Sequence, residues 1–352
     1  MIRVNASRLR AGIAELFAAG GMDADKAAIV AEALVEADLI GHATHGSALI
    51  EGYLDALATG ELNGRGGYEV VADRGACVTW RGKRLPGAWL LRQAMELACE
   101  RAPQFGVVTV AIGGSHHTGA LAAYLPLATE RGFVAEICCS TTSAARMAPF
   151  GGTEPVLTPN PLAIGLPTEE DPILIDVSSS ITTTSLTRTL AAKGERYPEK
   201  WALTAAGEPT DDPREVTERG GTLLPLGGTH KGYKGFGLAL MVDVLSQGLS
   251  DFGRADPPSP MSLAVFLQVI DPEAFSGRAA FARRAGFVAD ACRAVRPAPG
   301  VSNVRVPGDG AARARRTALK DGVPVDTGVL AGLARRAGQL GVEWSVSPVE
   351  AE

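Results

Sequence analysis

The sequence predicts an α/β protein in which helices cover a mixed, partly parallel sheet. Short apolar segments rich in β-branched residues recur along the chain, and segments with helical periodicity lie between them. The strand-like segments are VVTVAI (107–112), FVAEICC (133–139), ILIDV (173–177) and LAVFLQVID (263–271). The helical segments lie around residues 87–102, 119–131 and 235–249. Strands that alternate with helices are typical of layered α/β folds.

The first 60 residues are predicted to be helical. Apolar side chains recur with a helical period in residues 9–17, and the glycine pair at 20–21 ends this helix. Asp23 is suited to cap a second helix that runs to about residue 39. A third helix is expected to begin near Thr44 and to end before Gly60, so that GHATHG (41–46) forms the corner between two helices. The segments YEVVAD and CVTWRG then predict a hairpin.

The composition is that of a soluble globular protein. The chain has 352 residues, of which 46% are hydrophobic and 21% are charged. Its net charge of −5 argues against nucleic acid or an anionic membrane as the main partner. No apolar run approaches the roughly 20 residues that a membrane helix needs. The N-terminus lacks the apolar core of a signal peptide and the five cysteines lack a C-x-x-C spacing, so we expect reduced thiols and a cytoplasmic protein.

All five histidines lie in glycine-bracketed segments: His42, His45, His116, His117 and His230. A His-x-x-His pair such as His42 and His45 can place two metal ligands on one face of a helix, but a zinc site also needs a third ligand. A helix break runs through this pair, no H-E-x-x-H motif occurs, and two adjacent histidines point apart. The sequence therefore predicts no metal site.

His45 is better suited to proton transfer. Histidine titrates near neutral pH and contributes roughly 10²- to 10⁴-fold to a rate as a general acid or base. A helix N-terminus lowers the pKa of a histidine, because the helix dipole opposes the cation. Thr44 carries the nearest hydroxyl in the sequence that can orient the ring. The alternative is a histidine that only caps the helix.

No nucleotide-binding signature is complete. The segment GDGAAR (308–313) lacks the third glycine of a Rossmann G-x-G-x-x-G fingerprint and lies near the C-terminus. The segment GGTHKGYKG does not match a P-loop. It does place Lys234 at the start of a predicted helix, where a lysine and free N–H groups are suited to a phosphate. The alternative is a flexible surface turn with solvated lysines.

These segments together resemble the malate/L-lactate dehydrogenase type 2 family of NAD(P)H-dependent oxidoreductases. That family includes sulfolactate and ureidoglycolate dehydrogenases, a diketogulonate reductase and piperideine-carboxylate reductases. The likeness rests on ADLIGHATHGSALIEGYLDAL, GGSHHTGAL, MAPFGGTEPVLTPNPLAIGLPT, ILIDVSSS, GYKGFGLALMVDV and VFLQVIDPEAF, which follow the family's order. The resemblance implies a three-layer mixed α/β sheet of the family's own type, not a Rossmann fold.

The resemblance also implies roles for individual residues. His45 would donate or accept the proton at the oxygen or nitrogen on the reacting carbon, and Thr44 stands where many members carry a serine that relays charge to this histidine. The implied cofactor positions are His117, Thr118, Gly119, Ala120, Leu121, Asp176, Val177, Ser178, Tyr233, Lys234, Gly308, Asp309 and Gly310. If Asp309 met the ribose hydroxyls, its charge would favour NADH.

Three substrate positions depart from the family. Leu49 stands where the family usually has an arginine that grips the substrate carboxylate, and Pro159 replaces a substrate-contacting threonine. Leu186 ends the run that aligns with the Arg-Gly-Asp of ketimine reductases or the Gly-Lys of many malate enzymes. Either another residue holds the carboxylate, or the substrate presents an apolar group at that place. The departures count against a ketimine reductase.

We therefore expect a homodimeric dehydrogenase or reductase that uses NADH or NADPH, with the choice left open, on a small 2-oxo or 2-hydroxy compound. The alternatives are an imine reductase that acts on a cyclic or N-alkyl ketimine, and a dinucleotide-binding homologue without turnover. Three segments are expected: 1–67 with the catalytic corner, 68–300 with the sheet and the cofactor site, and 301–352, which packs back onto them. Residues 186–232 are predicted to form a turn-rich excursion, and residues 311–342 to be helical.

Overall fold

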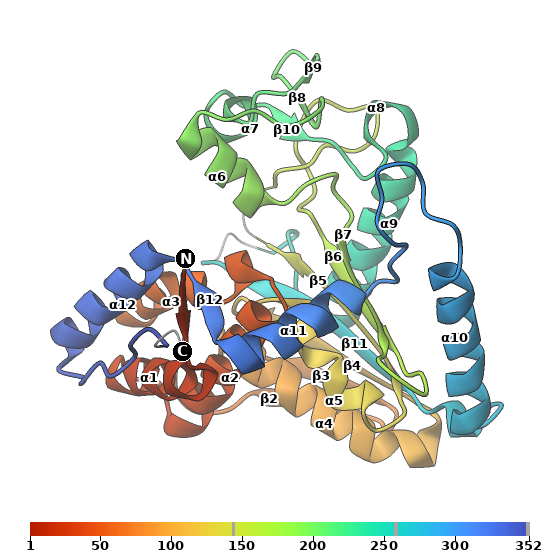
Figure 1. Cartoon of the computed structure of the whole chain (residues 1–352), viewed down its shortest axis with the longest axis horizontal. Coiled ribbons are helices and arrows are strands. Elements are labelled where there is room, and N and C mark those ends of the chain that lie inside the picture. The colour runs from red at the N-terminus through yellow and green to blue at the C-terminus, as the bar shows by residue number, and fades with distance from the viewer. Residues whose placement is uncertain (143–144, 257–259, 350–352) are drawn as a thin grey trace.

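A seven-stranded mixed sheet forms the centre of the computed structural model, which describes residues 1–142, 145–256 and 260–349. The strands run in the order β2-β3-β4-β11-β5-β6-β7 (Figure 1). Their bounds are β2 (Glu69–Asp73), β3 (Cys77–Arg81), β4 (Val107–Ser115), β5 (Val134–Thr141), β6 (Pro161–Leu166), β7 (Ile173–Ser178) and β11 (Leu263–Ile270). The predicted hairpin and all four predicted strands are confirmed.

The sheet is more antiparallel than the sequence indicates. In the described chain β3 and β4 are the only parallel neighbours in it, joined by the crossover helix α4 (Gly87–Phe105). The late strand β11 inserts between β4 and β5 and runs antiparallel to both. Strands β5, β6 and β7 follow as an antiparallel meander. The strand β6, which begins at a proline and is followed by another, was not predicted. The alternation of helix and strand along the chain therefore does not imply parallel pairing here.

Helices cover both faces of the sheet, which confirms the three-layer arrangement. Alternate side chains of a strand point to opposite faces. Val265 and Leu267 of β11 join the large core under α4, whereas Phe266 packs with Val242 of α9 (Tyr233–Asp243) on the other face. The turns η4 (Val244–Gly248) continue α9 across β4, β5 and β11.

The two ends of the chain are interlocked. β1 (Ile2–Val4) pairs antiparallel with β12 (Val323–Val325), as Figure 1 shows, and Val4 also forms a bridge with Pro348. Around this pair pack the helices α1 (Ala6–Ala19), α2 (Ala24–Leu39), α3 (Ile50–Thr59), α11 (Asp309–Asp321) and α12 (Thr327–Leu340). The helical prediction for residues 311–342 is thus confirmed except for the strand β12.

The predicted excursion is a small lobe that projects from the sheet at the top of Figure 1. It contains α6 (Thr184–Lys193), β8 (Ala202–Leu203), β9 (Pro209–Thr210), α7 (Arg214–Glu218), β10 (Thr222–Leu223) and α8 (Gly228–Lys231). It has its own core, in which Tyr197, Val216 and Leu223 pack with Met147 and Leu157. The turn-rich sequence is therefore ordered around buried side chains.

The remaining elements are η3 (Leu121–Tyr124), α5 (Pro126–Thr129), η5 (Pro272–Ala274) and α10 (Arg278–Arg293). The short helices η3 and α5 contact strands β5, β6 and β7, whereas η5 contacts α4 and α10. The long helix α10 was not predicted, and it buries only Ala289 fully. Across the described segments, no helix combines the length and the apolar character needed to cross a membrane.

Candidate active site

The GHATHG corner is made of two 3₁₀ turns, η1 (Ala43–His45) and η2 (Ser47–Leu49). The prediction that the third helix begins near Thr44 was wrong, because α3 starts only at Ile50. Gly46 between the two turns has φ −102° and ψ −135°, which is not helical and breaks the run. His45 therefore does not lie in the first turn of an α-helix, and a helix dipole does not account for its pKa.

The carboxylate of Asp38, a residue of α2, is hydrogen-bonded to the backbone of this corner. Its Oδ2 atom accepts a hydrogen bond of 2.9 Å from the backbone N–H of Ser47, and its side chain is buried. A Cβ atom on Gly46 would overlap the Asp38 carboxylate, so only glycine fits there. Burial raises the pKa of Asp38 to about 6, despite the hydrogen bonds from Ser47 that lower it.

The ring of His45 is oriented by the preceding residue. The Thr44 hydroxyl oxygen lies 3.0 Å from Nδ1 of His45, so the predicted contact is present. Burial lowers the pKa of His45, the nearby His42 lowers it further, and the carboxylate of Asp176 opposes both effects. His45 is thus predominantly neutral around pH 7 and has a partner that can hold the proton on Nδ1.

His117 lies beside His45, in the loop that follows β4. The two rings are stacked, with centroids 6.0 Å apart and planes inclined by 19°. Nδ1 of His117 is 2.7 Å from the hydroxyl of Tyr53, a residue of α3, and it also accepts the N–H of Gly119 at 3.2 Å. His116 instead packs beside Tyr53 at the edge-on angle of 85°.

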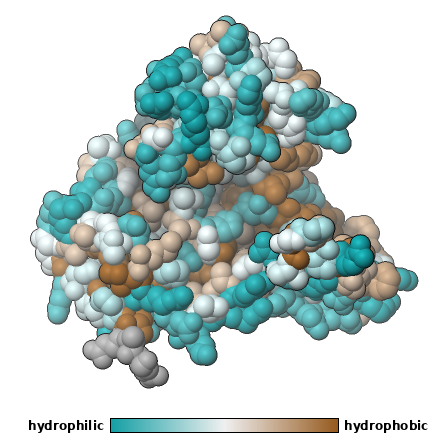
Figure 2. Space-filling view, turned by 45° about the horizontal axis from the view of Figure 1, so that its top comes forward, coloured by the Kyte–Doolittle hydropathy of each residue, from teal (hydrophilic) through white to brown (hydrophobic). Residues whose placement is uncertain are grey.

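His45 and His117 line a cavity of about 560 Å³ below the small lobe. Figure 2 shows the surface hollowed between this lobe and the rest of the molecule. The lining comes from residues 41–45 of the corner, 117–121 after β4, Cys139 and Thr141 of β5, 158–161, Asp176 and Ser178 of β7, 183–185 at the start of α6, Met261 and Leu263. Among these described lining residues there is no lysine or arginine, and Asp176 is the only carboxylate. Asp176 accepts the backbone N–H of Ala122 at 2.9 Å.

A second cavity, of about 310 Å³, continues along the same strand. Leu174 of β7 lines it, and alternation places Leu174 on the same strand face as Asp176 and Ser178 of the first cavity. Ala122 and Ile40 line the second cavity, while their neighbours Leu121 and Gly41 line the first. The two cavities are therefore adjacent.

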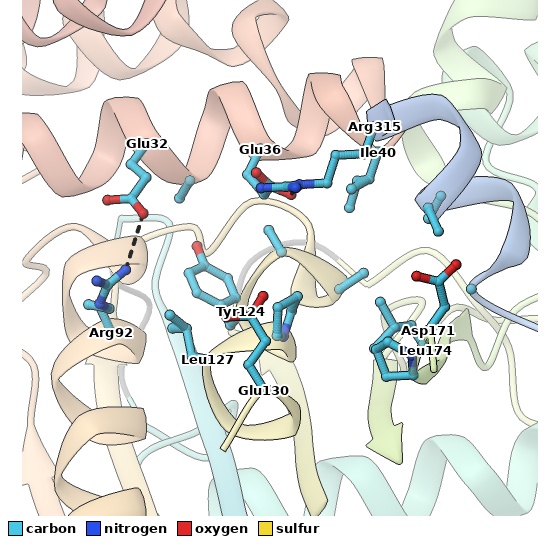
Figure 3. Close-up of a pocket in the computed structure, with 18 of the residues that line it drawn as sticks. Glu32, Glu36, Ile40, Arg92, Tyr124, Leu127, Glu130, Asp171, Leu174 and Arg315 are labelled. Atoms are coloured by element: carbon cyan, nitrogen blue, oxygen red, sulfur yellow. Dashed lines mark hydrogen bonds and ion pairs between the residues drawn. The ribbon is translucent and has the colours of Figure 1, made fainter. Parts of the chain in front are cut away.

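Charged side chains ring this second cavity in pairs, as Figure 3 shows. Nη1 of Arg92 lies 3.3 Å from Oε1 of Glu32, and Nε of Arg315 lies 2.6 Å from Oε1 of Glu36. Both glutamates are on α2. Arg316 lies 2.8 Å from Asp171. Each arginine that lines the cavity thus already has a carboxylate partner.

The sequence matches the malate/L-lactate dehydrogenase family over residues 4–334. The chain belongs to this family. It is 31% identical to a malate dehydrogenase of Pyrococcus abyssi over 97% of each protein. It is also 31% identical to an L-lactate dehydrogenase of Cupriavidus necator, over 93% of this chain and 95% of that relative. The structure of a malate dehydrogenase from Pyrococcus horikoshii matches with a TM-score of 0.88 at 29% identity, over 97% of this chain and 96% of that one.

Membership in the malate/L-lactate dehydrogenase family makes the protein an oxidoreductase and confirms the resemblance seen in the sequence. The family's fold, in place of a Rossmann fold, is also confirmed. Of the residues singled out from the sequence, the first cavity brings together Thr44, His45, His117–Leu121, Pro159, Asp176 and Ser178.

Other predicted site residues lie elsewhere. Leu49 packs against the main core, and Leu186, which is 40% exposed, points away from the cavity that its neighbour Ser185 lines. Val177 is 42% exposed, because alternation along β7 turns it away from the face that carries Asp176. Of the substrate positions that depart from the family, only Pro159 lines the cavity.

The predicted cofactor residues of the later chain are also outside the first cavity. Tyr233 and Lys234 are exposed at the start of α9, where the ring of Tyr233 packs edge-on against Phe150. Gly308 lines the second cavity. Gly310 follows in the first turn of α11.

Asp309 has partners within the chain. Its carboxylate accepts hydrogen bonds from Arg293 at 2.7 Å and from the backbone N–H of Val306 at 2.8 Å. The Arg293 guanidinium lowers the pKa of this carboxyl. Both carboxylate oxygens of Asp309 thus have partners within the chain, and its contact with cofactor ribose hydroxyls stays a prediction.

Several lining residues were not predicted. Three separate segments supply them, namely Cys139, the pair Thr158 and Asn160, and Met261, and only the folded sheet brings them to one place. Tyr53 was expected solely as an apolar residue of the third helix. In the part of the chain that the structure describes, no three His, Cys, Asp or Glu side chains are grouped so as to hold a metal ion.

Proposed function

We propose that the protein is an NAD(P)H-dependent oxidoreductase that moves hydride between a nicotinamide and the carbonyl or hydroxyl carbon of a small 2-oxo or 2-hydroxy compound. The observation that carries this proposal is the shared cavity. His45, with its hydroxyl partner Thr44, faces the same space as the 117–121 loop and Asp176. A proton-exchanging group therefore lies beside the segments to which the family resemblance assigns the cofactor.

The two adjacent cavities suit an extended ligand. Each is within or near the roughly 300–1,000 Å³ of ordinary ligand pockets, and together they follow one face of β7. At the wall of the second cavity residue 308 packs closely on β7: a Cβ atom on Gly308 would lie 2.9 Å from the backbone nitrogen of Leu174. A nicotinamide dinucleotide, when bound, supplies or takes the hydride. The choice between NADH and NADPH stays open.

The residues around His45 support proton exchange in both directions. In reduction, His45 donates the proton from Nε2 to the substrate oxygen, while Nδ1–H donates to the Thr44 hydroxyl oxygen. After this step the ring is neutral and keeps the Nδ1–H tautomer. In oxidation, the same unprotonated Nε2 accepts the proton of the substrate hydroxyl. Thr44 thus acts as the residue that keeps Nε2 directed at substrate.

The lining of the cavity supports a substrate with at most one carboxylate. Its described residues offer hydroxyls from Thr118, Thr141 and Thr158, but no lysine or arginine. A carboxylate buried without a partner costs several kcal/mol. We therefore favour a monoacid or an ester with an apolar side chain over a dicarboxylate such as malate.

We also propose a homodimer, as the family resemblance implies. Large apolar side chains stay exposed along α9 and the turns that follow it, namely Leu240, Met241, Val244 and Leu249. This apolar surface supports burial against a second copy of the chain. Size-exclusion chromatography with light scattering tests the proposal, and a monomer at all concentrations would contradict it.

The function is tested with the whole protein and both cofactors. Loss of NAD(P)H fluorescence is followed with a panel of 2-oxo acids and esters and, separately, with a panel of cyclic and N-alkyl imines. Turnover of the carbonyl panel is the expected result. Faster turnover of imines would replace the proposal by an imine reductase. Cofactor binding with no turnover on either panel would identify a homologue that only binds the dinucleotide.

A further inference from the structure

We propose that Tyr53 is a positioning residue that fixes the ring tautomer of His117, so that His117 serves as a permanent, neutral hydrogen-bond donor in the cleft. His45 then exchanges protons, while His117 holds a carbonyl oxygen of a bound ligand. The inference rests on the proposed function for its meaning in catalysis. Its structural content, the tautomer, is independent of any turnover.

Two contacts set the state of Nδ1. The N–H of Gly119 points at Nδ1 of His117 at 3.2 Å, and a backbone N–H can only donate, so this long contact favours an unprotonated Nδ1. The Tyr53 hydroxyl lies closer, at 2.7 Å, and in this state donates to the same nitrogen. With two donors on Nδ1, the single proton of the neutral ring belongs on Nε2.

The surroundings keep the ring in this state. Tyr53 is buried, and burial raises the pKa of its hydroxyl, so the hydroxyl stays protonated. Burial, with smaller effects from the neighbouring His45 and His116, lowers the pKa of His117 to about 3. Protonation at Nδ1 would also turn its proton toward the Gly119 N–H and would require the Tyr53 hydroxyl to accept. His117 is thus neutral around pH 7.

Nε2 of His117 is left for a ligand. It has no hydrogen-bond partner within the described residues, and His117 lines the cavity beside His45. His45 differs at Nδ1, which contacts the Thr44 hydroxyl and no backbone N–H, and in the Asp176 carboxylate, which favours its cationic form. The two stacked rings therefore have different roles, one as acid or base and one as a fixed donor to a carbonyl oxygen.

The Tyr53→Phe variant tests the assignment, because it keeps the ring and removes only the hydroxyl. ¹⁵N NMR of the full-length protein, labelled at histidine, reports which ring nitrogen carries the proton, and a His117→Gln spectrum assigns the signals. In the wild type we expect a pure Nε2–H tautomer for His117, unchanged across the neutral range. In Tyr53→Phe we expect a mixture of tautomers and a higher His117 pKa. The kcat/KM should fall about tenfold, the value of one hydrogen bond to a buried group.

The matched control is Tyr197→Phe. Tyr197 is equally buried, and its hydroxyl donates to the Thr187 hydroxyl at 2.9 Å in the small lobe, without touching a histidine or the 117–121 loop. It should leave the tautomer of His117 unchanged. Cofactor affinity without substrate then separates the two sources of the carbonyl oxygen. A higher cofactor dissociation constant in Tyr53→Phe indicates that His117 binds the carboxamide of the nicotinamide. A change confined to the substrate KM indicates that His117 binds the substrate.

An Nδ1–H tautomer of His117 in the wild type would overturn the inference, even if Tyr53→Phe failed to fold. A folded Tyr53→Phe protein with an unaltered His117 spectrum would also overturn it. A wild-type Nε2–H tautomer in a protein without turnover on any panel would leave the assignment standing and reject the proposed function instead.

Discussion

The imidazole rings of His45 and His117 are stacked, with their centroids 6.0 Å apart, although one comes from a 3₁₀ turn and the other from the loop after β4. The rings differ in what they contact. Nδ1 of His45 meets the Thr44 hydroxyl, whereas Nδ1 of His117 meets Tyr53 and the N–H of Gly119. The predictions below use this difference and the way the corner around His45 is held.

Replacing His45 by alanine should lower turnover by roughly 10²- to 10⁴-fold and leave cofactor affinity nearly unchanged, because the ring exchanges a proton and is not needed to bind the dinucleotide. Steady-state kinetics and fluorescence titration measure the two quantities. His230→Ala is the matched control. His230 is exposed outside the cavity and makes the same contact as His45, with Nδ1 3.0 Å from the Thr229 hydroxyl. Wild-type turnover in His45→Ala at neutral pH would end the proposed role.

The pH dependence should differ between the two directions of the reaction. The pKa of His45 is lowered from its usual 6.5 by burial, so the neutral ring that accepts a proton predominates at pH 7. The rate of oxidation should therefore fall only below pH 6.5, where the His45 ring becomes protonated; this part of the pH profile is its acid limb. Reduction needs the protonated ring, so its rate should decline as the pH rises through the same range. Asp176→Asn removes the charge that raises the His45 pKa, so it should move the limb to still lower pH. A limb above pH 6.5 would contradict the assignment to His45.

Malate should be a poor substrate compared with a monoacid or ester bearing an apolar side chain. No lysine or arginine lines the described cavity, so the second carboxylate of malate would be desolvated without a permanently charged partner. The test is kcat/KM for malate, lactate and a larger 2-hydroxy compound, with both cofactors. A preference for malate of about tenfold or more, equal to about 1.4 kcal/mol of transition-state stabilisation, would show that another group binds the carboxylate.

Asp38→Asn should change how stability depends on pH. The pKa of Asp38 is raised from 3.8 to about 6, so its contribution is fully present below the unfolded value and is lost as pH rises to about 6. Asparagine keeps an oxygen for the Ser47 N–H and does not titrate. Relative to wild type, the variant should therefore gain about 2 kcal/mol between pH 4 and 7. Urea unfolding at several pH values measures this gain, and a difference independent of pH would exclude a buried, titrating Asp38.

Local sequence patterns predict much of the secondary structure. The period of the apolar residues in 9–17 is enough to predict α1, and the β-branched runs predict β4, β5, β7 and β11. Pairing direction is not local. β11 follows β7 in sequence but inserts between β4 and β5, which depends on the complementarity of whole strands. The start of the third helix was also misjudged, because the contact of Gly46 with Asp38 is a tertiary contact that local propensity does not contain.

The sequence by itself determined the family, the layered α/β fold, and the pairing of His45 with Thr44, since adjacent residues and ordered motifs carry that information directly. Only the tertiary structure decided which residues share the cleft. It joined Tyr53 to His117, directed Leu186 and Val177 away from the cavity, and gave Asp309 an arginine partner. The physical reason is that a contact between distant segments depends on strand alternation, burial and hydrogen-bond geometry, which exist only once the sheet and its covering helices have packed.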